Sequence, residues 1–135
     1  MRIVVGFIRS PEGQAALARA VEEARLRDAE LVVVHSIRGG ERDEGKQVAE
    51  YTAEFEALEG KLSDEGIRFK LIDYVRGNSP SEDLLQAAAE EDAGLIVIGL
   101  RRRSAVGKLV MGSNAQEILL QSDLPVLAVK AATEA

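Results

Sequence analysis

The residues of this chain that are best suited to ligand chemistry gather between positions 99 and 114. Gly112-Ser113-Asn114 precedes apolar residues at helical spacing, so this tripeptide is expected to open a helix. The unpaired amide groups and the positive dipole end of a helix start attract anions. Gly112 lets an anion approach the main chain, and the hydroxyl of Ser113 adds a donor. The pattern predicts an anion site.

Basic side chains are concentrated in the same segment, although the chain as a whole carries a net charge of -6. The cations of the segment are Arg101, Arg102, Arg103 and Lys108, and Arg9, after the first predicted strand, could join them. Gly99 directly follows a buried strand and is expected to permit a sharp turn into this loop. Two interpretations are open, an anion site or a solvated basic loop before an ordinary Ser/Asn helix cap.

Short aliphatic runs predict the strands that would position this segment. They are Ile3–Phe7, Leu31–Val34, Leu95–Ile98 and Val126–Val129. Each run is continuously apolar rather than alternating, which is typical of strands buried on both faces of a parallel sheet. Ile67–Val75 has a more mixed character and is expected to be a strand near a sheet edge.

Helical segments alternate with these strands. Ser10 and Pro11 predict the N-cap and first position of one helix. Ser79-Pro80-Ser81-Glu82 forms a capping box that opens another helix, running to about Asp92. Apolar spacing predicts two more helices, one through Val48, Tyr51, Phe55, Leu58 and Leu62, and a last one through Ala115, Ile118, Leu119 and Ser122.

The resulting order of elements is βαβαβαβαβ in one domain over residues 1–135. In such a fold ligands bind outside the carboxyl ends of the strands, where the loop at Gly99–Asn114 would lie. The polar, glycine-rich stretch Ser36–Lys46 is expected to be a mobile surface loop.

The spacing of the loop resembles that of the universal stress protein family. Members that bind ATP carry Gly, two residues, Gly, nine residues, then Gly followed by Ser or Thr. Gly99, Arg102 and Gly112-Ser113 keep this spacing, with Arg in place of the second Gly. The flanking matches extend the resemblance over essentially the whole chain: Val33-Val34-His35, Gly77-Asn78-Ser79-Pro80, Leu95–Gly99 and Leu124–Lys130.

The resemblance implies a Rossmann-like α/β fold of the adenine nucleotide alpha hydrolase-like type. Its open five-stranded parallel sheet would have the order 3-2-1-4-5, with four flanking helices. The family's ligand would be ATP or AMP, and its partner a second copy paired through Val126–Val129. The site residues expected here, with those taken from the basic segment, are Gly99, Arg102, Gly112, Ser113, Asn114, Ser36 and Arg9.

Two positions depart from the ATP-binding pattern. Ile8 stands where the family usually has an Asp that contacts the nucleoside, and Arg102 replaces a glycine that lets phosphates approach the backbone. Two functions therefore stay open. One is a binding module for a phosphate-bearing ligand, by default a nucleotide. The other is a regulatory protein with a degenerate pocket, whose arginines form a recognition surface.

The composition argues against several other functions. A net charge of -6 disfavours nucleic acid and anionic membranes as partners, and there are no cysteines for disulfides or thiolate metal sites. No apolar run approaches the roughly 20 residues of a membrane span, so a cytoplasmic location is expected. The lone His35 is expected to be structural. No catalytic residues and no metal site are predicted; a slow ATPase activity is left open.

Overall fold

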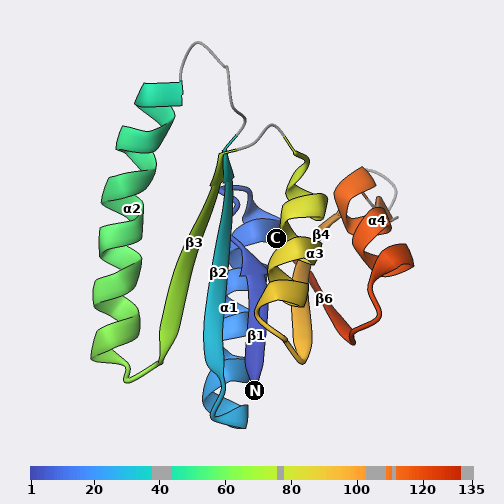
Figure 1. Cartoon of the computed structure of the whole chain (residues 1–135), viewed down its shortest axis with the longest axis horizontal. Helices are drawn as coiled ribbons and strands as arrows, with labels where there is room; N and C mark the ends of the chain where they lie inside the picture. The colour runs from blue at the N-terminus through green and yellow to red at the C-terminus, as the bar shows by residue number, and fades with distance from the viewer. Residues whose placement is uncertain (38–43, 76–77, 103–108, 111, 132–135) are drawn as a thin grey trace.

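Five parallel strands in the order β3-β2-β1-β4-β6 form the sheet of the computed structural model (Figure 1). The structure describes residues 1–37, 44–75, 78–102, 109–110 and 112–131. The parallel strands are β1 (Arg2–Gly6), β2 (Glu30–Ile37), β3 (Phe69–Val75), β4 (Leu95–Arg102) and β6 (Val126–Lys130). The helices are α1 (Pro11–Arg27), α2 (Glu44–Asp64), α3 (Pro80–Glu90) and α4 (Ser113–Gln121). This arrangement confirms the predicted order and the four helices.

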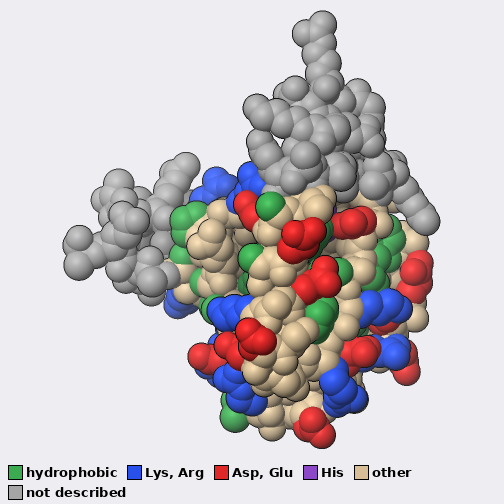
Figure 2. Space-filling model, turned by 90° about the vertical axis from the view of Figure 1, so that its left-hand side faces the viewer, with side chains coloured by type: hydrophobic (Ala, Val, Ile, Leu, Met, Phe, Trp, Pro, Cys, Tyr) green, Lys and Arg blue, Asp and Glu red, His purple; other side chains and the backbone are tan. Residues whose placement is uncertain are grey.

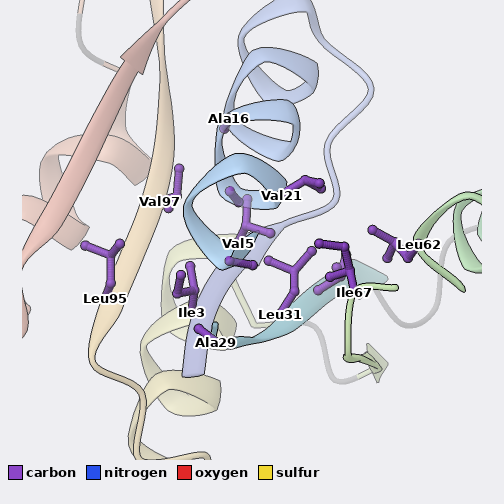
Figure 3. Close-up of a cluster of buried hydrophobic side chains, with 13 residues drawn as sticks. Ile3, Val5, Ala16, Val21, Ala29, Leu31, Leu62, Ile67, Leu95 and Val97 are labelled. Atoms are coloured by element: carbon purple, nitrogen blue, oxygen red, sulfur yellow. The ribbon is translucent and has the colours of Figure 1, made fainter. Parts of the chain in front are cut away.

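The central strands are buried on both faces, as their unbroken apolar sequences predict. Successive side chains of a strand point to opposite faces, so Ile3 and Val5 meet α1 while Val4 meets α3. Figure 3 shows the first of these clusters, in which Ala16 and Val21 of α1 lie over β1 and its neighbours. The alanines of α1 let the helix approach the sheet closely. Two helices thus cover each face, α1 and α2 on one, α3 and α4 on the other.

The second helix lies at the outer side of the sheet, next to the edge strand β3 (Figure 1). Leu62 is its fully buried contact with the core, and Leu58 packs against the same cluster. Figure 2 looks onto this side of the molecule, where acidic and basic side chains are interspersed. Among the described residues, no helix combines the length and apolar character needed to cross a membrane.

Two strands extend further at their carboxyl ends than the sequence suggests. Since β2 runs to Ile37, Ser36 belongs to a strand and not to a loop. The expected loop at Ser36–Lys46 is wrong at its other end too, because α2 begins at Glu44; residues 38–43 lie outside the described part. Similarly, β4 continues to Arg102, where it pairs antiparallel with the short strand β5 (Leu109–Val110).

Gly99 therefore lies within a strand and does not make the sharp turn expected of it. Gly99 instead allows the backbone of α1 to approach β4 closely. A Cβ atom on Gly99 would lie 2.1 Å from the carbonyl oxygen of Glu12, in the first turn of α1. Only a residue without a side chain lets the start of α1 rest on β4 at this point.

The helix starts follow the capping residues read from the sequence. The Ser10 side chain accepts a hydrogen bond from the Gly13 amide at 3.1 Å, and Ser79 accepts one from Glu82 at 3.2 Å. Proline follows each cap, as predicted. These caps are local interactions, so the sequence around them suffices to specify them.

Replacing Gly99 with alanine should destabilise the fold. The added methyl group would overlap backbone atoms of α1, and such overpacking costs about 1–3 kcal/mol or more. Urea denaturation should show a lower midpoint for Gly99→Ala. Gly60→Ala is the matched control, because a Cβ atom there meets nothing within 4 Å and alanine favours a helix. Equal midpoints for Gly99→Ala and wild type would contradict the proposed contact.

Candidate functional site

A cavity of about 310 Å³ lies at the carboxyl ends of β1, β2 and β4. The starts of α1, α3 and α4 close it, and α2 contributes Tyr51. In an open parallel sheet, this end of the strands is where ligands bind. The lining residues are Gly6, Phe7, Ile8, Gly13, Ala16, Val34, Ser36, Tyr51, Pro80, Ser81, Leu84, Val97, Ile98, Gly99, Asn114, Ala115 and Ile118.

The described walls of this cavity are mostly apolar and contain no charged side chain. Their side-chain polar atoms belong to Ser36, Ser81, Tyr51 and Asn114, that is, to hydroxyls and one amide. Apolar walls with a few fixed polar groups are typical of sites for small organic molecules. The cavity therefore suits an uncharged part of a small organic ligand, and a charged part would lie outside these walls.

Three of the predicted site residues line the cavity directly: Ser36, Gly99 and Asn114. Gly112 is the N-cap of α4 and Ser113 its first residue, both exposed beside Asn114. The structure thus brings the predicted anion site to the mouth of the cavity. Arg102 is the last residue of β4; its side chain and residues 103–108 lie outside the described part.

Of the three helix starts at the cavity, that of α4 is the most suited to an anion. The first turn of α1 contains Glu12, and that of α3 contains Glu82 and Asp83, whereas α4 has no acidic residue there. Its N-cap Gly112 has no side chain to bond the first amides of the helix. Those amides remain available to water or to an anion.

Arg9 does not point to the start of α4 but contacts α2. Its guanidinium lies 2.9 Å from the carboxylate of Glu54 and 4.5 Å from the ring centroid of Tyr51. Sequence reasoning missed this arrangement because both partners lie on a helix that is far away along the chain. Arg101, by contrast, lies 3.5 Å from Glu12 at the start of α1.

An aromatic cluster of Phe7, His35, Tyr51 and Phe55 holds α2 against the strand ends. The rings of His35 and Tyr51 lie 3.7 Å apart, centroid to centroid, and those of Phe7 and Phe55 4.8 Å apart. Phe7 and Tyr51 also line the cavity, so the cluster shapes one of its walls. The sequence identified Tyr51 and Phe55 only as members of a helical apolar stripe.

His35 is buried, as expected of a structural residue. It is 2% exposed, and its Nδ1 lies 3.2 Å from the Asp73 carboxylate. Burial lowers the pKa of His35 below its usual value, and the charge of Arg9 acts in the same direction. The hydrogen bond and charge of Asp73, with the charge of Glu54, oppose this shift without cancelling it.

Acidification should weaken the fold through His35. The folded protein binds this proton less readily than the unfolded chain, whose histidine pKa is about 6.5. The contribution of neutral His35 to the free energy of unfolding is complete above that pH and declines as the pH falls below it. Urea denaturation at pH 7.5 and 5 should show a larger loss of stability for wild type than for His35→Phe, which cannot take up a proton.

Asp73→Asn is the informative companion variant, because it removes a charge that raises the pKa of His35. The loss of stability between the two pH values should then be larger than in wild type. An identical pH dependence in wild type and His35→Phe would show that the buried ring is not the group responsible.

Comparisons with known proteins agree with this geometry. A model of the universal stress protein family matches residues 1–130. A universal stress protein of Mycolicibacterium smegmatis is 41% identical over 128 residues, covering 95% of this chain and 96% of that protein. A solved universal stress protein from Archaeoglobus fulgidus has a TM-score of 0.81 and 37% identity, covering 96% of this chain and 98% of its own. Another structure from that organism, in complex with dAMP, has a TM-score of 0.75 and 33% identity, with the same coverage.

Proposed function

This chain belongs to the universal stress protein family, and we propose that it binds a phosphate-bearing ligand, an adenine nucleotide such as AMP or ATP. The observation that carries the proposal is the cavity with uncharged walls that opens at the start of α4. The base would occupy the cavity, and the phosphate would accept hydrogen bonds from the amides at Gly112–Asn114. The relative that was solved with dAMP supports a nucleotide as the ligand.

We propose binding rather than turnover. The side chains that line the cavity offer hydroxyl and amide groups, which are weak bases at neutral pH. Arg102 and the arginines around it would add positive charge near the phosphate. Release of phosphate from ATP above the protein-free rate would contradict this part of the proposal.

Placing an acid at the N-cap of α4 should separate helix stability from ligand binding. Aspartate is a good N-cap residue, and the Gly112 backbone, with φ -67° and ψ 160°, accepts an L-residue. Gly112→Asp should therefore keep or raise the melting temperature. It should weaken AMP binding in calorimetry about tenfold or more, because its carboxylate occupies the amides and repels the phosphate.

Gly112→Asn is the matched control for charge, since it caps the helix with a neutral side chain. It should weaken binding less than Gly112→Asp. Equal affinities for Gly112→Asp and wild type would contradict the placement of the phosphate at α4.

We also propose that the chain forms a homodimer through β6. Within the described residues β6 pairs only with β4, so its other edge is open, and Val126, Leu127 and Val129 are only half-buried. An open apolar edge invites pairing with another strand. The neighbouring helix α4 exposes Leu120, which is 76% accessible, and these features suit a second copy.

Charges at Ala128 test this dimer, because its side chain is exposed on β6. Ala128→Asp and Ala128→Lys should each shift the mass measured by light scattering toward the monomer, since like charges would meet across the two-fold axis. A mixture of the two variants should recover dimers. A wild type that is monomeric at micromolar concentration would contradict the proposal.

The alternative function, a regulatory protein that acts through contacts with other proteins, rests on a different observation. Ile8 is 51% exposed at the cavity, where a family member that binds ATP usually has an acid. Partners that are lost on changing Arg101–Arg103 to alanine, without an effect of nucleotide, would favour this alternative.

A further inference from the structure

A chain of hydroxyl groups connects the start of α3 to α4. The Ser79 and Ser81 hydroxyl oxygens lie 3.0 Å apart, and the Ser81 hydroxyl donates to Oε2 of Glu117 at 2.7 Å. Ser81 is fully buried and lines the cavity, and Glu117 is half-buried. The hydrogen bond between Ser81 and Glu117 is assigned no role by the sequence analysis or by the proposed function.

Which group donates each of these hydrogen bonds follows from the chemistry of the groups. A carboxylate only accepts hydrogen bonds, so the one proton of Ser81 is used on Glu117. Ser79 must then donate to Ser81, while its own oxygen accepts from the Glu82 amide at 3.2 Å. Each hydroxyl both accepts and donates, and such chains strengthen their members cooperatively.

The two helices that the chain joins are held to the core very differently. Leu84, Ala87 and Ala88 of α3 are buried against the sheet, whereas Ile118 is the buried residue of α4. Among the described residues of α4, only Ala115 packs against the same cluster besides Ile118, so apolar contacts constrain this helix less than they constrain α3. The hydrogen bond from Ser81 gives α4 a second attachment, a polar one, on the firmly packed α3.

The second attachment lies one helical turn from the predicted anion site. Asn114 precedes Glu117 by three residues, so both lie on the same side of α4. Asn114 and Ser81 both line the cavity. A change in the position of Glu117 therefore moves the first amides of α4 relative to the cavity.

We infer that Ser81 and Glu117 are positioning residues that hold the start of α4 in the orientation that binds the ligand's phosphate. The inference rests on the proposed function. Without the hydrogen bond between Ser81 and Glu117, α4 spends part of its time in orientations that do not bind the phosphate. The apparent affinity then falls in proportion to the population that still has the binding orientation. The charge of Glu117 is not required for this role, because an amide oxygen also accepts the Ser81 hydroxyl.

Calorimetric titration with AMP tests the inference on wild type, Ser81→Ala, Glu117→Ala and Glu117→Gln. Ser81→Ala and Glu117→Ala should each weaken binding about three- to tenfold, and the double variant no more than either alone. Glu117→Gln should stay close to wild type. Gln116→Ala is the control, because its side chain is exposed on the same helix.

A spectroscopic readout without ligand separates orientation from general stability. The amide resonances of Ser113 and Asn114 should shift in Ser81→Ala and Glu117→Ala, but stay in place in Glu117→Gln and Gln116→Ala. Unmoved amides in all four variants would overturn the inference. So would tighter AMP binding by both Glu117 variants, which would mean that this carboxylate acts only by repelling the phosphate.

The two proposals fail in distinguishable ways. Wild type that binds AMP, with Ser81→Ala and Glu117→Ala binding equally well, overturns the positioning role alone. Wild type that binds neither AMP nor inorganic phosphate overturns the proposed function, and the positioning role with it.

Discussion

At Gly99 the backbone of β4 lies so close to the carbonyl oxygen of Glu12 that no side chain fits between them. The first turn of α1 is thereby fixed on β4, which is separated by β1 and β2 from the edge strand β3. A similar contact lies one residue further along α1, where a Cβ atom on Gly13 would be 2.3 Å from the Ile8 carbonyl oxygen. Both glycines line the cavity, so these backbone contacts help to set its shape.

The remaining walls of the cavity are formed by α2, α3 and α4, which come from different parts of the sequence. The aromatic cluster brings Tyr51 of α2 to one side, and the starts of α3 and α4 form the other. The cavity between these elements is lined mostly by apolar residues, and its described walls contain no charged side chain. In a chain with a net charge of -6, the start of α4 differs from the other two helix starts by having no acid in its first turn. The same end of the sheet thus has an apolar cavity beside a helix start without acidic side chains in its first turn, and the two parts of the proposed nucleotide would fit these two features.

The sequence was most informative where the determining interactions are local. Ser10 and Ser79 cap helices through amides three residues away, and the strand interiors are recognisable from unbroken aliphatic runs. The carboxyl ends of β2 and β4 were predicted too short, because their polar and glycine residues resemble a loop. Gly99 illustrates the reason, since the contact that requires it comes from α1, distant in the sequence.

The candidate site was predictable only in part, for the same reason. The tripeptide Gly112-Ser113-Asn114 predicts a helix start, and in the structure this helix start lies at the cavity, as expected. Arg9 could not be placed from the sequence, because its partners Glu54 and Tyr51 lie on α2, which follows α1 and β2 in the sequence. The hydrogen bond between Ser81 and Glu117 joins two helices through residues that are 36 positions apart in the sequence, and no local pattern indicates it.

The most direct test of this account is the electron density of AMP in crystals of the chain grown with that nucleotide. The account predicts the adenine within the cavity and the phosphate at the amides of Ser113 and Asn114. A phosphate at the start of α3, or a nucleotide bound outside the cavity, would contradict it.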